Sequence, residues 1–200
     1  MTNSQYKIDP AKAFGHLVYE YRCLVRAEFA YKQADKHKCI NDFIPEIGTV
    51  ARNAVLQKAR SLIKFYMPLS RDTDITSEKY FGISLSVIDN KLYKKLENIY
   101  RSIEVHDLHL TVWRDPSYRN NKSDKMQRRE WNIEQDKIVE NLIKALEVIS
   151  KTSGLNDKWQ RVFRELHDCC ANVLKGDREW PEEFSSPEKI EKHLKSIGIP

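Results

Sequence analysis

Five titratable residues lie close together in the stretch DNKLYKKLENIYRSIEVHDLHLTVWR, which spans residues 89–114. They are an arginine, two histidines and two carboxylates: Arg101, Glu104, His106, Asp107 and His109. A guanidinium binds phosphate through paired hydrogen bonds, and an imidazole transfers protons near neutral pH. Metal-independent RNA cleavage needs both, because a base assists attack by the ribose 2′-hydroxyl and a cation stabilises charge at phosphorus. The structural alternative, which residue types alone favour, pairs Arg101 with Glu97 or Glu104 and makes the histidines hydrogen-bonded interior groups.

The periodicity of residues 89–114 predicts one helix that is apolar on two faces. One face carries Leu92, Leu96, Ile99, Ile103 and Leu110. A shorter stripe on the opposite face carries Val105, Leu108 and Val112. Such a helix must be buried on both sides, either inside a bundle or between two copies of the chain. Arg101 falls on the line of the second stripe, and His109 lies about 80° round the helix from it. If that stripe is a two-fold dimer seam, Arg101 and His109 of each copy meet in one cleft.

The segment that follows this helix, residues 113–131, alternates cations with aromatic rings. Its basic residues are Arg114, Arg119, Lys122, Lys125, Arg128 and Arg129. Its rings are Trp113, Tyr118 and Trp131. Cations bind phosphates and exposed rings stack on unpaired bases, so this segment is a second candidate for RNA binding. The alternative is a solvated loop in which Asp115, Asp124 and Glu130 partly cancel the charge.

Composition limits the remaining function classes. The chain has 200 residues, of which 40% are hydrophobic and 32% charged, typical of a soluble, helix-rich protein. A formal net charge of +5 permits a nucleic-acid partner without requiring one. We expect a cytoplasmic protein with no membrane segment, because there is no apolar window of spanning length and no hydrophobic signal segment. The four cysteines lack zinc-ligand spacing and no glycine-rich phosphate loop occurs, so no metal or cofactor is expected.

Helix start and stop signals divide the chain. Asp9-Pro10 begins a first helix, whose apolar stripe includes Phe29. A second helix ends at Pro68, and its apolar stripe includes Val50. A connector with one short helical turn beyond Thr76 then leads to the helix over 89–114. Further helices begin near residues 132, 156 and 187. No strand is expected. The prediction is an all-α fold: an up-and-down bundle of four to five helices over residues 1–176, and a C-terminal appendage with a short helix over residues 177–200.

The run YRSIEVHDLHLT, residues 100–111, resembles the HEPN superfamily (higher eukaryotes and prokaryotes nucleotide-binding). The signature of that superfamily is an arginine, four to six residues and then a histidine, on a late helix of a four- or five-helix bundle. Residues 50–66, VARNAVLQKARSLIKFY, resemble the second helix of its abortive-infection branch. The resemblance covers residues 9–114, and residues 40–115 best. Ser102 departs from the pattern, because active members usually carry Asn, Asp or His after the arginine.

The resemblance implies an RNA-directed homodimer, a metal-independent endoribonuclease of a defence or toxin–antitoxin system. Arg101 would hold phosphate, His109 or His106 would move the proton, and Glu104 or Asp107 would orient the histidine. His106 fits the short spacing, whereas His109 fits the His-Leu-Thr context and the helix geometry better. Many HEPN-like proteins are not catalytic, so the alternative is a helical dimerisation module that binds an antitoxin or another defence protein. A third possibility is RNA binding by residues 113–131 alone.

Overall fold

The computed structural model describes residues 9–36, 44–68, 74–103, 135–176 and 179–200. Within these ranges every regular element is helical and there is no strand, as the sequence predicts. The α-helices are α1 (Pro10–Lys36), α2 (Ile44–Tyr66), α3 (Ser77–Phe81), α4 (Leu85–Ile88), α5 (Asn90–Ile103), α8 (Gln135–Ser150), α9 (Asp157–Lys175) and α10 (Pro187–Ser196). A 3-10 turn, η3 (Glu182–Phe184), precedes α10. No helix in the described ranges has both the length and the apolar composition needed to cross a membrane.

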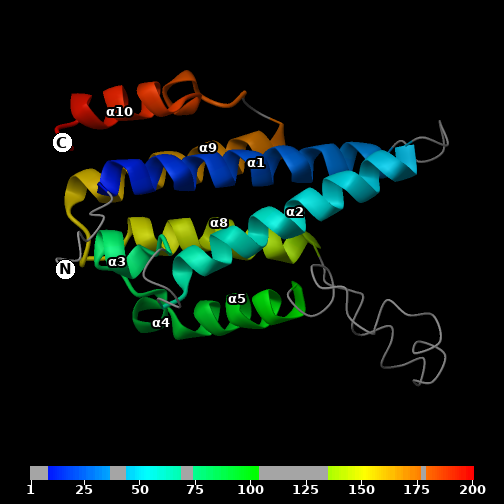
Figure 1. Ribbon diagram of the computed structural model, residues 1–200, viewed down its shortest axis with the longest axis horizontal. Coiled ribbons are helices and arrows are strands. Elements are labelled where there is room, and N and C mark those ends of the chain that lie inside the picture. The colour runs from blue at the N-terminus through cyan, green and yellow to red at the C-terminus, as the bar shows by residue number, and fades with distance from the viewer. Residues whose placement is uncertain (1–8, 37–43, 69–73, 104–134, 177–178) are drawn as a thin grey trace, which may run out of the picture.

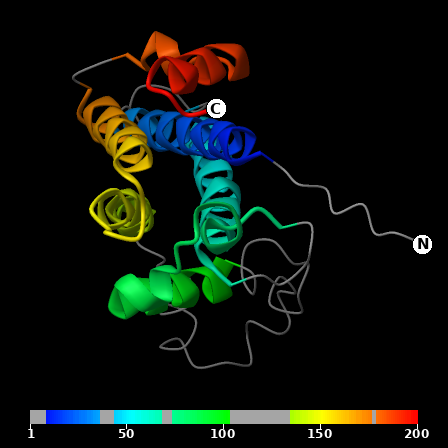
Figure 2. The ribbon, with the colours of Figure 1, turned by 90° about the vertical axis from the view of Figure 1, so that its left-hand side faces the viewer.

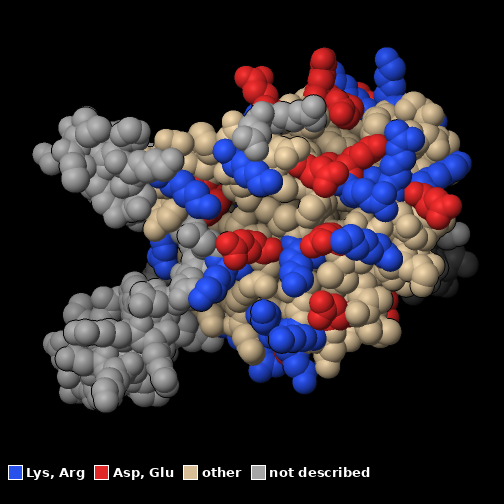
Figure 3. Space-filling view, turned by 180° about the vertical axis from the view of Figure 1, so that it is seen from behind, with Lys and Arg blue, Asp and Glu red and all other residues tan. Residues whose placement is uncertain are grey.

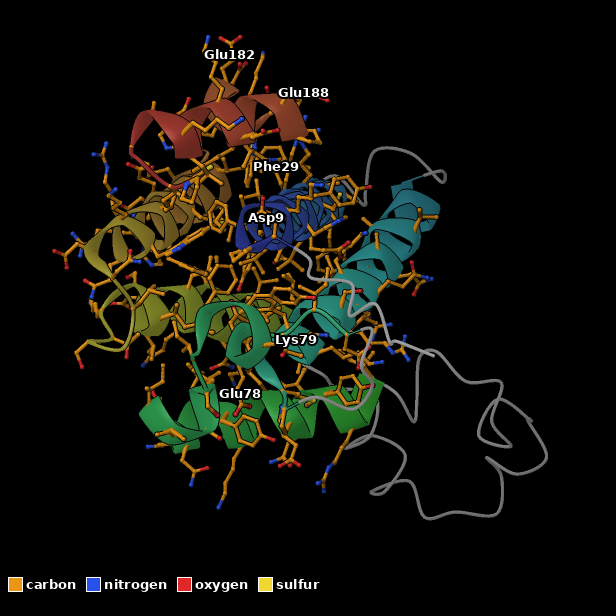
Figure 4. The ribbon with its side chains drawn as sticks, turned by 60° about the vertical axis from the view of Figure 1, so that its left-hand side comes forward. Asp9, Phe29, Glu78, Lys79, Glu182 and Glu188 are labelled. Atoms are coloured by element: carbon orange, nitrogen blue, oxygen red, sulfur yellow. The ribbon has the colours of Figure 1, made fainter. Side chains whose placement is uncertain are left out.

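Short-range capping signals determine where several helices begin and end. Asp9 Oδ1 accepts the Ala11 N–H at 2.9 Å, beside a proline in the first turn of α1, and Figure 4 shows Asp9 at that end. Asn156 caps α9 in the same way, accepting the Trp159 N–H at 3.0 Å. Gly176 ends α9 with φ of 80°, a left-handed conformation that glycine adopts at little cost. These boundaries confirm the sequence-based predictions for both helices.

The helices form layers. In Figures 1 and 2, α1 and α9 lie together, α2 and α8 lie below them, and α5 lies below α8 on the far side of the molecule from α10. α1 packs along α2 and also contacts α9 and α10, whereas α5 packs against α2, α4 and α8. α5 is therefore an outer helix, with one side on the core and the other directed away from it.

One hydrophobic core connects all the layers. At its centre, aromatic rings from three helices pack edge to face, with ring centroids 5.4 Å apart for Phe14 and Phe163 and 4.9 Å apart for Phe81 and Trp159. The segment from residue 179 onward joins the same core through Phe184, Ile190, Leu194 and Ile199. The C-terminal helix is thus held on the bundle by buried apolar side chains.

Two predicted core residues are exposed. Phe29 and Val50 fall on the apolar stripes expected for the first two helices, yet they are 41% and 69% exposed. The reason is visible in Figure 1, where the C-terminal end of α1 and the N-terminal end of α2 project beyond the other helices. There the two helices cover only each other, and a Cβ added at Gly48 would lie 3.6 Å from Ala34 Cβ.

Candidate nucleic-acid interface

The core-facing side of α5 matches the first predicted stripe as far as Ile103, and Leu110 lies outside the described residues. Leu92, Leu96 and Ile103 are buried, and Ile99 packs partly against the core. Asp89 precedes the helix, and its Oδ1 accepts the Leu92 N–H at 2.9 Å, which fixes where α5 begins. With this side anchored, the opposite side of α5 must face outward, and Figure 4 shows side chains of α5 extending away from the bundle.

The outward side of α5 is strongly basic. Five exposed residues share an arc of about 120°: Lys91, Lys94, Lys95, Asn98 and Arg101. We call these residues the α5 face. Four cations occur in α5, and Glu97 is its one acidic residue. In Figure 3, which shows the molecule from behind, Lys and Arg side chains gather at the lower edge, where α5 lies.

The three lysines of the α5 face have no acidic partner within the described part of the chain. Several lysines elsewhere do pair with a carboxylate. The described pairs are Lys32–Glu28, Lys58–Glu20, Lys151–Glu147, Lys189–Glu182 and Lys195–Glu191. A cation without an internal counter-charge keeps its full attraction for an external anion.

Arg101, the predicted phosphate-holding residue, lies at one end of the α5 face. Its side chain is 70% exposed, and Nη2 donates to Glu97 Oε1 at 2.7 Å. This is one of the two ion pairs that the structural alternative predicts. An exposed i,i+4 pair contributes only about 0.3–0.5 kcal/mol, so a phosphate competes readily with Glu97 for the guanidinium. The neighbouring Ser102 hydroxyl donates to the Asn98 carbonyl at 3.0 Å, within the helix itself.

The other predicted site residues lie outside the described residues. These are Glu104, His106, Asp107 and His109, together with Arg114, Tyr118, Arg119, Lys122, Lys125, Arg128 and Arg129. The same holds for the second apolar stripe, Val105, Leu108 and Val112. Of the predicted site, the structure therefore describes Arg101 and the helix that leads to it.

Sequence reasoning did not single out Lys91, Lys94 and Lys95. A signal was present, because their spacing of three and four residues places them on one side of a helix, opposite Leu92 and Leu96. A charged stripe of this kind is common on solvated helices. What marks this one is that three lysines without an ion pair among the described residues share one arc of the same helix, which becomes visible only in three dimensions.

A buried polar cluster lies in the core, away from the α5 face. The Tyr21 hydroxyl donates to the Leu142 carbonyl at 2.7 Å and lies 2.5 Å from the Tyr66 hydroxyl. Burial raises the pKa of both tyrosines well above the ordinary value, so both remain protonated across the neutral range. The cluster ties α1, α2 and α8 together, and we assign it a structural role.

No cluster of three His, Cys, Asp or Glu residues suited to a metal ion occurs in the part of the chain that the structure describes. Comparisons with protein-family models, with curated proteins and with solved structures found no match to this chain. Function is therefore inferred from the α5 face and from the residues that follow it in the sequence.

Proposed function

We propose that the protein is a HEPN-like protein that acts on RNA as a homodimer and cleaves it without a metal ion. The observation that carries the proposal is an exposed arginine, Arg101, at the end of a basic helix face, immediately before Glu104, His106 and His109 in the sequence. In this proposal residues 1–176 form the up-and-down HEPN-type bundle, and the protein works in the cytoplasm against an invading element or as a toxin.

The chemistry assigns a role to each residue type. His109, or His106 in its place, removes the proton from a ribose 2′-hydroxyl, whose oxygen then attacks the adjacent phosphorus. The bond between phosphorus and the 5′ oxygen breaks, the 5′ oxygen takes a proton from water, and a 2′,3′-cyclic phosphate remains. Arg101 neutralises the non-bridging oxygens while negative charge builds up on them. Glu104 or Asp107 orients the imidazole, and the residues of 113–131 hold the flanking RNA.

RNA cleavage in excess chelator tests the assignment, with wild type compared with Arg101→Ala, His109→Ala and His106→Ala. Loss of one charge-stabilising group should lower the rate about 10²–10³-fold. Arg161→Ala is a matched control, because Arg161 also forms an exposed i,i+4 pair with a glutamate, Glu165, at 2.8 Å. It should leave the rate unchanged. Full activity in both Arg101→Ala and His109→Ala would remove the assignment.

A second candidate function is a non-catalytic interaction module. It is favoured by the Glu97–Arg101 pair and by the Ser102 hydroxyl bonded within the helix, both ordinary features of a solvated helix face. The module would bind a protein partner such as an antitoxin or another defence component. It predicts a stable dimer or heteromer by light scattering and no cleavage of any RNA tested.

A further inference from the structure

We propose that the α5 face is a sequence-independent binding surface for the phosphate backbone of RNA, and that it leads the strand to Arg101. This inference rests on the proposed function, since it names the surface that delivers the substrate. It adds Lys91, Lys94 and Lys95, which lie outside the arginine–histidine motif and to which the family resemblance assigns no role.

The dimensions of the α5 face suit a nucleic-acid strand. From Lys91 to Arg101 the helix rises about 15 Å, at 1.5 Å per residue. One strand of double-stranded DNA carries a phosphate about every 3.4 Å along the axis, and a more extended single strand spaces its phosphates further apart, so the α5 face spans a few phosphates of an RNA strand. The cations share one arc of the helix, so a strand running along α5 meets all of them from one side.

The charge distribution favours approach from this side. In Figure 4, Glu182 and Glu188 lie on the outer surface of the C-terminal segment, on the opposite side of the bundle from α5. Residues 179–200 carry five carboxylate side chains and three lysines, a net charge of −2, whereas α5 carries four cations and one carboxylate, a net charge of +3. A polyanion is therefore drawn to α5 and repelled by the C-terminal segment.

The chemistry of the α5 face indicates contact with the backbone rather than with the bases. Its exposed side chains are those of lysine, asparagine and arginine. The two rings of α5, Tyr93 and Tyr100, are half-buried and fall outside the basic arc, so neither offers a free stacking surface there. The arc also carries no exposed large apolar side chain that would insert into a lipid surface. Binding should therefore be insensitive to base sequence and sensitive to salt.

The test compares two triple variants that each remove three positive charges. Lys91→Gln, Lys94→Gln and Lys95→Gln together remove the lysines of the α5 face, whereas the control replaces Lys189, Lys192 and Lys195 of α10 with Gln. Fluorescence anisotropy measures binding to oligo-U and oligo-A with 2′-O-methyl groups, which lack the attacking hydroxyl, between about 50 and 200 mM salt. Thermal unfolding checks that all three proteins fold alike.

Each phosphate contact with a single strand contributes about 0.7 to the slope of log K against log salt. The α5 triple variant should lose about 2 units of slope and weaken binding about tenfold or more at low salt, equally for both RNAs. The α10 variant should bind like wild type. An α5 variant that matches the α10 variant, or a wild-type protein that binds neither RNA, overturns the inference. Binding to vesicles with acidic lipids that needs the α5 lysines, without RNA binding, also overturns it.

The cleavage assay separates this inference from the proposed function. If RNA binding depends on the α5 lysines but neither the wild type nor any variant cleaves RNA, the binding surface is supported and the nuclease is refuted. Cleavage that survives the α5 triple substitution with an unchanged salt slope would support the nuclease and refute the binding surface.

Discussion

Removing either hydroxyl of the Tyr21–Tyr66 pair should destabilise the protein, but by unequal amounts. Tyr21 has one proton and donates it to the Leu142 carbonyl at 2.7 Å. The Tyr66 hydroxyl, 2.5 Å away, must therefore donate to the Tyr21 oxygen. Both side chains are buried, so no water replaces a lost partner. The two tyrosines thus have different roles in a directed chain of hydrogen bonds.

The direction of this chain sets the magnitudes. Tyr66→Phe removes one hydrogen bond and leaves only an unfilled lone pair on Tyr21, which should cost about 1 kcal/mol. Tyr21→Phe removes two hydrogen bonds and leaves the Tyr66 O–H buried without an acceptor, which should cost about 2–3 kcal/mol. The double variant contains no orphaned donor, so it should be no less stable than Tyr21→Phe alone. The stability loss of the double variant should therefore be about 1 kcal/mol smaller than the sum of the two single losses.

Urea unfolding followed by circular dichroism measures these differences, and Tm should fall by about 2–4 °C per kcal/mol for a chain of this size. Tyr19→Phe is the matched control, because Tyr19 is exposed, its ring lies under Lys58, and that contact survives the substitution. It should change stability by less than about 0.5 kcal/mol. A Tyr66→Phe variant that is less stable than Tyr21→Phe, or strictly additive effects, would refute the assigned direction of donation.

The same cluster predicts how stability depends on pH. Burial raises the pKa of Tyr21 and Tyr66 in the folded state, whereas an unfolded tyrosine titrates near about 10. The stabilisation is therefore complete below that value and is lost as the pH rises above it, because the unfolded state releases protons that the folded state retains. Ultraviolet absorbance of tyrosinate should show two tyrosines that ionise only when the protein unfolds.

Other predictions concern the C-terminal segment and the thiols. Leu194→Ala should destabilise the protein by about 2–5 kcal/mol in urea unfolding, because Leu194 is buried in the shared core. Lys192→Ala, on the exposed side of α10, is its control. Burial and the adjacent Cys169 raise the pKa of the Cys170 thiol. At pH 8 a thiol reagent should therefore label half-buried Cys23 before Cys170. Equal labelling rates of the two thiols in the folded protein would contradict this.

Local signals allowed much of the fold to be predicted from the sequence. Capping residues such as Asp9, Asn156 and Gly176 act through backbone groups only a few residues away, so their sequence context is sufficient. α4 was missed because a four-residue helix, Leu85–Ile88, is too short to show a period. Phe29 and Val50 were placed wrongly because periodicity identifies the apolar side of a helix but not how far its neighbours extend.

The candidate site was predictable only in part, for a physical reason. The sequence places Arg101 on a helix and predicts its partner Glu97, because residues four apart meet on a helix surface. It does not reveal that Lys91, Lys94 and Lys95 lack acidic partners among the described residues. That property depends on which residues of α2, α4 and α8 lie beside α5 in space.

The contacts of α1 have a consequence for synthesis on the ribosome. Phe14 packs against Trp159 and Phe163, and Tyr21 donates to a carbonyl 121 residues later, so the partners of the first helix are translated long after it. Once residue 66 has left the exit tunnel, α1 can pair with α2, but the apolar side that will meet α9 stays uncovered. Until that helix leaves the exit tunnel, this side is available to chaperones and prone to self-association.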